Sequence, residues 1–218
     1  MYLYIIVAGS FAELFVRSRL VVSTDATATA REILSNESLF RLGFSGEFLH
    51  LAFDVVVAVI LYALLRPVDR NVALLAAFMR VACDLILAMA GLSHFAALRL
   101  LGDSNYLKSF QPDQLQTLAL LAMKLHGDAY AISLVFFGFA CLALGYLLFR
   151  ASYFPRLLGV LMAASGLAYL ISSFAHFLAP AMAGALLPIL ALPFASELSL
   201  ALWLLIRDVS FTAPPSRR

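Results

Sequence analysis

The sequence predicts an all-α integral membrane protein: a bundle of six transmembrane helices, with a short interfacial helix between the first and the second. Hydrophobic residues make up 63% of the 218 residues and charged residues only 13%, and the mean hydropathy is +0.95. A water-soluble domain of this size could not bury so much apolar surface. A spanning helix needs about 20 mostly apolar residues. Six stretches meet this requirement, at residues 2–21, 44–65, 72–98, 117–149, 155–178 and 182–206.

We expect these helices to form a single transmembrane domain over residues 1–210, followed by a short cytoplasmic tail over residues 211–218. The opening stretch lacks the basic leader and small-residue cleavage site of a secretory signal, so we interpret it as a retained first span. Pro188 and Pro193 lie inside the sixth stretch. We expect them to bend this helix, because proline removes a backbone donor.

The two longest connections predict different structures. In residues 22–43, Asp25 is a candidate helix start, and the amphipathic stretch after it is typical of a short helix on the membrane surface. Residues 99–116 are polar and rich in turn residues. We expect a simple surface loop there.

A repeated pattern indicates the orientation in the membrane. The second, fourth and sixth helices each end with an aromatic ring four residues before an arginine, in "YALLR", "YLLFR" and "WLLIR". Arginine in short loops marks the cytoplasmic side, and aromatic rings prefer the headgroup zone. The pattern therefore predicts a multi-pass membrane protein with both termini in the cytoplasm.

Several classes of function and site are not indicated. A net charge of +2 without a basic block argues against nucleic-acid binding. Cys83 and Cys141 both fall inside apolar runs, so they form no disulfide framework or CxxC site. Glycines on the fourth and fifth spans predict close helix contacts rather than phosphate binding. These glycines are Gly138, Gly145, Gly159 and Gly166.

Ionisable side chains inside the apolar stretches are the most informative polar feature. Near the bilayer centre each charged group costs about 3 kcal/mol. These residues must therefore face the interior, pair with one another or become neutral. They are Glu13, Asp54, Arg80, Asp84, Lys124, Asp128 and Glu197.

Spacing suggests partners for most of them. The i, i+4 pairs Glu13–Arg17, Arg80–Asp84 and Lys124–Asp128 each lie on one helix face, within reach of one another. Asp54 and Glu197 have no such local partner. Either they reach a base on another helix, such as Arg80 or Lys124, or burial keeps them protonated.

The four histidines lie at helix ends that alternation places in the outer half of the membrane. Glu47, His50 and Asp54 share one face of the second helix. Polar residues also share one face of the third helix, from Arg80 to His94, and of the fifth, from Ser165 to His176. These faces together indicate a polar interior that opens outward. For His94 and His176, a simple position at the wet interface is an equally good interpretation.

A metal site is an alternative use of these residues. Glu47 and His50 have the i, i+3 spacing of carboxylate-bundle metal sites, although those sites need two such motifs. His50, His126 and Asp54 could hold zinc with a position left open for water. A bis-histidine haem is a weaker alternative, since no attachment motif is present.

Several segments resemble the bacterial membrane protein family called domain of unknown function 4386 (DUF4386). The most specific is "FFGFACLALGYLLFRASYFPRLLG" at residues 136–159. The others are "AELFVRSRLVV", "ESLFRLGF", "LLRPVDR" and "ELSLALWLL". The resemblance covers nearly the whole chain and implies a six-helix protein of the bacterial cytoplasmic membrane. It implies no activity, cofactor or site residues.

We expect a non-enzymatic role, in which a small lipidic or protonatable molecule binds in or passes through an outward-opening polar pocket. The alternatives are a metal-dependent, hydrolase-like intramembrane enzyme and a structural accessory subunit. We expect no cofactor, with zinc as the alternative, and the lipid bilayer as partner; oligomeric state stays open. The candidates for the pocket or a proton pathway are Glu47, His50, Asp54, Arg80, Asp84, Lys124, His126, Asp128 and Glu197.

Overall fold

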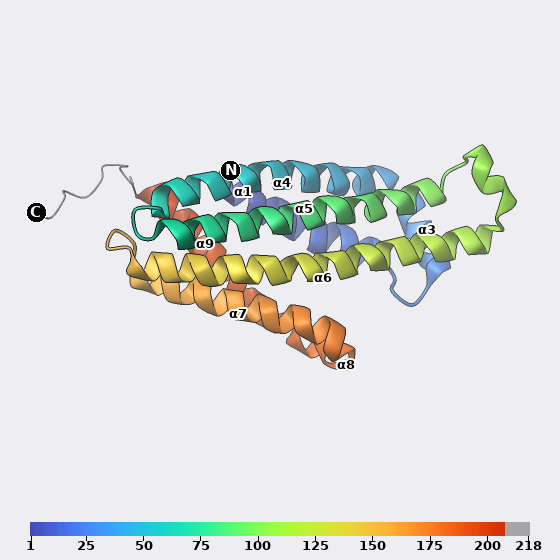
Figure 1. The fold of residues 1–218 in the computed structure, drawn as a ribbon. Helices are drawn as coiled ribbons and strands as arrows, with labels where there is room; N and C mark the ends of the chain where they lie inside the picture. Colours follow the sequence, from blue (N-terminus) through green and yellow to red (C-terminus); the bar gives the residue numbers. More distant parts are fainter. Residues whose placement is uncertain (208–218) are drawn as a thin grey trace, which may run out of the picture. The chain divides into compact units, whose positions relative to one another are not determined.

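The computed structural model describes residues 1–207, apart from the side chains of residues 12–14, 183 and 187, and every regular element in this part of the chain is helical. Figure 1 shows the long helices α4 to α7 and the shorter segments that connect them. The elements are α1 (Tyr2–Phe11), the π-helical turn η1 (Ala12–Arg17), α2 (Ser18–Leu20), α3 (Ala26–Ser35), α4 (Glu37–Leu65), α5 (Arg70–Leu100), the 3-10 helix η2 (Asn105–Ser109), α6 (Pro112–Arg150), α7 (Arg156–Leu178), α8 (Pro180–Ala183), the 3-10 helix η3 (Gly184–Leu190) and α9 (Ala191–Ile206).

Five helical segments in the described residues are long and apolar enough to cross a membrane. They are Glu37–Leu65, Arg70–Leu100, Pro112–Arg150, Arg156–Leu178 and Gly184–Ile206. The all-α class is thus confirmed, and the pattern is that of a membrane protein. The first predicted span, residues 2–21, is helical as α1, η1 and α2, but it is not among the five.

The observed helices extend beyond the predicted apolar stretches. α4 begins at Glu37 rather than near residue 44, and α6 runs for 39 residues from Pro112. At the usual rise per residue α6 is about 58 Å long, whereas the hydrocarbon core of a bilayer is about 30 Å thick. Hydropathy identifies only the part of a helix that lipid can surround, so it misses polar extensions.

The predicted helix start at Asp25 is confirmed. The Asp25 side chain accepts a hydrogen bond from the Ala28 N–H at 2.9 Å, which caps the N-terminus of α3. The connection at residues 99–116 is not a simple loop as expected, because it contains the short 3-10 helix η2. Pro188 lies inside η3, where the last helical segment departs from α-helical geometry, as expected.

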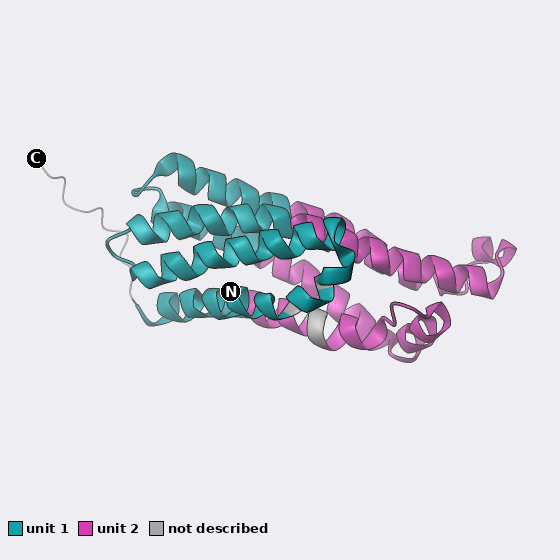
Figure 2. Ribbon diagram, turned by 90° about the horizontal axis from the view of Figure 1, so that it is seen from below, with its two compact units in different colours: residues 1–3, 54–83, 134–218 teal, residues 4–53, 84–133 magenta. Residues whose placement is uncertain are grey.

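The chain divides into two compact units, coloured separately in Figure 2. Unit 1 comprises residues 1–3, 54–83 and 134–218, and unit 2 comprises residues 4–53 and 84–133. Residues 208–218, which include the predicted tail, lie outside the described part of the chain. Each unit is a helical bundle with its own buried residues.

In unit 1, the carboxyl half of α6 packs against α7 through glycines. A Cβ atom added to Gly145 would lie 2.6 Å from the Ala163 nitrogen, and one added to Gly159 would lie 2.5 Å from the Phe149 nitrogen. Such distances are too short for any side chain, so the two backbones approach as closely as they do because both positions are glycine. The predicted close helix contacts are confirmed here.

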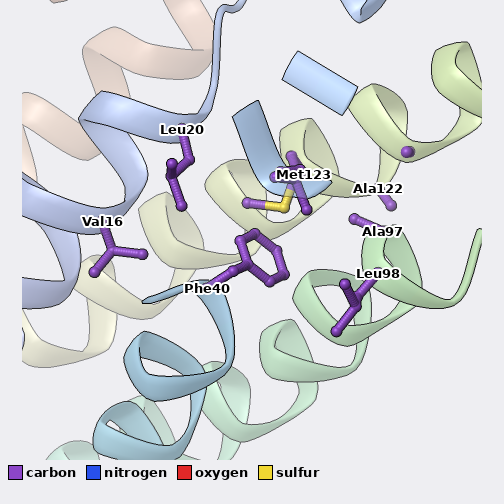
Figure 3. Packing of buried hydrophobic residues seen from close by; sticks show 9 residues of the cluster. Val16, Leu20, Phe40, Ala97, Leu98, Ala122 and Met123 are labelled. Atoms are coloured by element: carbon purple, nitrogen blue, oxygen red, sulfur yellow. The ribbon is translucent and has the colours of Figure 1, made fainter. Parts of the chain in front are cut away.

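Unit 2 has an apolar core to which all of its major segments contribute. Figure 3 shows the Phe40 ring of α4 between Val16 and Leu20 on one side and Ala97 and Leu98 of α5 on the other. The remaining members are Ile33 of α3 and Ala119, Ala122 and Met123 of α6. Three polar residues lie close to this core along the chain: Arg17 follows Val16, and His94 and His126 each lie about one helical turn from a core residue.

Candidate metal centre

Three metal-ligating side chains converge in unit 2. Glu47 of α4, His94 of α5 and His126 of α6 each offer one ligand atom, and these atoms all lie within 4.8 Å of one another. The three residues come from three different helices, and both histidines are buried. Two imidazoles and one carboxylate form a ligand set that zinc and related divalent metals prefer.

The orientation of His126 suits a metal ligand. Its Nδ1 atom lies 2.9 Å from the backbone oxygen of Ala90. A carbonyl only accepts, so Nδ1 carries the proton and donates, and Nε2 keeps its lone pair. Nε2 is buried, makes no hydrogen bond and lies 3.7 Å from Glu47 Oε1. A ring that donates through one nitrogen and presents the other is the usual arrangement of a histidine that binds metal.

His94 lies in an aromatic environment beside this group. Its ring centroid is 4.2 Å from that of Phe40, 5.7 Å from that of Phe44 and 5.3 Å from that of His126. Only 3% of His94 is exposed. Neither ring nitrogen makes a well-formed hydrogen bond, and the polar group nearest the ring is the backbone of Phe40. A buried polar group without a partner costs about 1–3 kcal/mol, so its presence needs an explanation.

The third member, Glu47, also contacts a cation. Arg17 Nη2 lies 3.6 Å from Glu47 Oε1, the same oxygen that faces His126. The Arg17 guanidinium also lies over the ring of Tyr130, 5.6 Å from its centroid. The pairing of Arg17 with Glu47 was not predicted. The predicted partner, Glu13, has a side chain outside the described residues.

The metal alternative predicted from the sequence had one of its three ligands in this group. His126 is a member, but His50 Nδ1 lies instead 3.0 Å from the Ile5 backbone oxygen. Asp54 belongs to unit 1, where it pairs with a cation. For His94, the interpretation as a residue at the wet interface was wrong, because its side chain is buried.

The other candidates in unit 2 differ in exposure. Asp84 is buried and Asp128 is half-buried. Lys124 is exposed, so it is not part of the buried polar group of unit 2. It lies two residues before His126, about 200° around the helix from that buried side chain, and a lysine can bury its aliphatic stem while keeping its ammonium group in water.

Unit 1 contains a second polar group, built around Arg80. Arg80 Nε donates to Asp54 Oδ2 and Nη2 donates to Oδ1, both at 2.6 Å, and both side chains are almost fully buried. The guanidinium lies 5.4 Å from the ring centroid of Tyr2 and 5.0 Å from that of Phe137. Of the two alternatives for Asp54, the contact with a base on another helix is confirmed. The bidentate partner of Arg80 is Asp54 rather than the predicted Asp84.

Glu197 is the remaining buried acid of unit 1. Its Oε1 atom accepts a hydrogen bond from the Tyr169 hydroxyl at 2.8 Å. Tyr169 in turn packs edge-on against Phe137, with ring centroids 5.3 Å apart. A cavity in this unit is lined by apolar side chains of α4, α5 and α6, and by Arg80. The lining of this cavity is therefore mainly apolar.

Comparison with known proteins places the chain in a family. A protein of Archaeoglobus fulgidus described as "Uncharacterized protein" is 27% identical over 164 residues, which are 74% of this chain and 81% of the relative. No solved structure matches the chain. The model of the family described as "Domain of unknown function (DUF4386)" matches residues 1–207. The chain therefore belongs to the DUF4386 family, as its sequence segments indicate.

Proposed function

We propose that this protein is a metal-dependent membrane enzyme of the hydrolase type, with zinc held by Glu47, His94 and His126. The observation that carries the proposal is the convergence of these three side chains, with ligand atoms within 4.8 Å of one another. This arrangement favours the enzyme alternative over the non-enzymatic pocket that the sequence alone makes the first expectation.

The residues present fit a metal better than they fit a purely structural role. Nε2 of His126 is buried without a hydrogen bond, and the buried ring nitrogens of His94 have no well-formed one, with only the backbone of Phe40 beside them. A metal ion would use one lone pair from each ring and remove much of this cost. Zinc is the first choice, because two imidazoles and one carboxylate form one of its common catalytic ligand sets.

Three protein ligands leave a fourth position of a tetrahedral ion for water or substrate. Zinc in such a site activates a bound water at neutral pH and polarises a carbonyl or phosphoryl oxygen. The chain's own contribution is positioning. Ala90 fixes the His126 ring through its backbone oxygen, and Phe40 and Phe44 hold His94 and keep bulk water from it.

For the membrane arrangement we propose six spans: the five segments named above and, before them, the helical segment Tyr2–Leu20. We propose α3 as the interfacial helix. Both termini then lie in the cytoplasm of a bacterial cell. The arginines at the ends of α4 and α6 support this orientation. The metal centre then lies toward the outer leaflet.

Binding or passage of a small lipidic or protonatable molecule in unit 1 is a second candidate function. It is favoured by the buried carboxyl group of Glu197, which a tyrosine hydroxyl holds in place. A buried carboxyl is a common element of proton and small-molecule pathways in membranes. The Asp54–Arg80 pair, by contrast, fits a structural role, because each charge neutralises the other.

A zinc titration tests the proposed function. Chelator-treated protein in detergent should bind one zinc ion per chain and unfold at a higher temperature with zinc present. At a free zinc concentration one hundred times the Kd the gain is about 2.7 kcal/mol. The zinc-loaded protein should hydrolyse p-nitrophenyl acetate or p-nitrophenyl phosphate, and the chelated protein should not.

Matched variants separate the centre from general histidine chemistry. His126→Gln should weaken zinc binding by more than about 10–100-fold, the cost of losing a group that merely orients a ligand. His176→Gln removes a histidine of unit 1 and should leave zinc binding unchanged. Equal zinc binding by the two variants would rule the site out, and zinc binding without zinc-dependent hydrolysis would rule out the enzyme.

A further inference from the structure

We propose that the open position of this metal centre takes an oxyanion of the phosphate class, and that Arg17 is the residue that selects it. The inference rests on the proposed metal site and names the kind of group that the site recognises. A phosphate on a lipid headgroup and a free phosphate share this chemistry.

The first step is the position of Arg17. Its Nη2 atom contacts Glu47 Oε1, and His126 Nε2 faces the same oxygen atom. The guanidinium therefore contacts one of the proposed metal ligands directly, and only the Glu47 carboxylate separates it from the metal position. Arginine recognises phosphate and carboxylate through a planar fork of N–H donors, so an anion on the metal would lie within its reach.

The second step is the backbone that carries Arg17. Arg17 is the last residue of the π-helical turn η1. π-Helical turns are rare and occur frequently at functional sites, because the wider turn redirects a side chain. Val16, next to it, is buried in the core of unit 2, and the Tyr130 ring supports the guanidinium. The cation is thus held in position and does not swing freely in solvent.

The third step is charge. Glu47 and Arg17 balance one another, and the histidines are neutral when they act as ligands. A divalent cation added to these groups leaves an excess of two positive charges in a poorly hydrated site. Uncompensated buried charge is costly, so an anion on the metal is strongly favoured. A dianionic phosphate offsets the whole excess, whereas a neutral ester offsets none of it.

The fourth step is the position in the membrane. In the six-span arrangement proposed above, His94 and His126 lie toward the outer ends of their helices, and the outer leaflet offers phosphate groups on its lipid headgroups.

Cobalt(II), a spectroscopic substitute for zinc, provides the test. Protein loaded with cobalt should change its visible spectrum when inorganic phosphate is added in detergent, or when phosphatidic acid is added to phosphatidylcholine vesicles. A response to phosphatidic acid alone identifies a lipid headgroup as the source, and a response to inorganic phosphate alone identifies a free phosphate. Acetate should give a weaker response.

Arg17→Gln should keep cobalt binding, or strengthen it, because a neighbouring positive charge is removed. Its affinity for phosphate should fall by about 10–100-fold, the usual effect of losing a charge-assisted hydrogen bond. Arg17→Lys keeps the charge without the fork and should lie in between; it also serves if Arg17→Gln does not fold. Arg19→Gln, at an exposed position two residues further on, is the control and should match the wild type.

The possible failures are distinguishable. If the wild-type protein binds no cobalt, the metal site itself is wrong. If cobalt binds but neither form of phosphate changes the spectrum, the proposed oxyanion is wrong. An equal response of wild type, Arg17→Gln and Arg17→Lys would show that Arg17 does not select the anion.

Discussion

The Nδ1 atom of His126 lies 2.9 Å from the backbone oxygen of Ala90. This hydrogen bond leaves Nε2 as the atom that faces Glu47, and it does so in a part of the bundle where water does not compete. A backbone oxygen cannot be removed by mutation, which makes the orientation of the ring a property of the fold. The imidazole is therefore set up to act as a ligand before any ion arrives.

Zinc binding should depend on pH in a definite direction. Both histidines must be unprotonated to act as ligands. At a pH low enough to protonate both rings, protons compete with the metal, so the apparent zinc affinity should decrease by up to about 100-fold per pH unit. Competition titrations carried from pH 7.5 down to the pH at which zinc is released would measure this slope. A limiting slope of no more than about 10-fold per pH unit would speak against two histidine ligands.

The Asp54–Arg80 pair should be important for stability. Asp54→Ala leaves the buried Arg80 guanidinium without its carboxylate, and we expect a loss of about 3–5 kcal/mol. The double variant Asp54→Leu/Arg80→Met removes both charges and should be more stable than Asp54→Ala. Thermal unfolding in detergent provides the comparison. If the double variant is the less stable of the two, the pair contributes more than mutual neutralisation.

Gly145 should be intolerant of even a methyl group. Gly145→Ala would place a Cβ 2.6 Å from the Ala163 nitrogen, which forces α6 and α7 apart and should cost about 1–3 kcal/mol. Gly127, on the same helix, has no atom within 4 Å of an added Cβ. Gly127→Ala should therefore be neutral, or stabilising by about 0.5–1 kcal/mol through helix propensity. Unfolding temperatures of the two variants decide, and similar values for both would contradict the close contact.

The N-cap of α3 gives a local test. Asp25→Ala removes the acceptor of the Ala28 N–H, which should destabilise α3 by about 0.5–2 kcal/mol, whereas Asp25→Asn keeps an oxygen at that position. Hydrogen exchange should show faster exchange at the amide of Ala28 in Asp25→Ala than in Asp25→Asn. Equal exchange in both would mean that the side chain does not cap the helix.

Features that depend on short stretches of sequence could be predicted well. The apolar stretches predict the helices, Asp25 predicts the start of α3, and Gly145 and Gly159 predict a close approach of two helices. Each of these relies on one local signal: hydropathy over about 20 residues, a capping side chain, or a missing Cβ. The membrane character of the chain and its family follow from the same kind of information.

The composition of the metal centre could not be predicted. Glu47 and His126 were both candidates for the polar pocket, but only His126 was among the zinc ligands of the metal alternative, and for His94 a position at the wet interface was an equally good interpretation. Whether residues on three helices meet depends on how each helix is rotated about its axis and on its offset along the bundle. One residue of offset turns a side chain by about 100°, and hydropathy does not specify that angle in a helix that is apolar all round.

Lys124 and Arg80 show the same limit for ion pairs. The i, i+4 rule places Lys124 next to Asp128 and Arg80 next to Asp84 on a helix surface. In the structure Arg80 instead uses its fork on Asp54 of another helix, and Lys124 is exposed. A buried guanidinium gains more from two parallel hydrogen bonds than from a pair at the helix surface.

X-ray absorption at the zinc edge tests the central claim most directly. For protein loaded with zinc, we predict one ion per chain with nitrogen and oxygen neighbours at about 2.0–2.1 Å and the scattering pattern of two imidazoles. The double variant His94→Gln/His126→Gln should lose that pattern. No bound zinc in the wild type, or a spectrum dominated by sulfur neighbours at about 2.3 Å, would contradict a centre built from Glu47, His94 and His126.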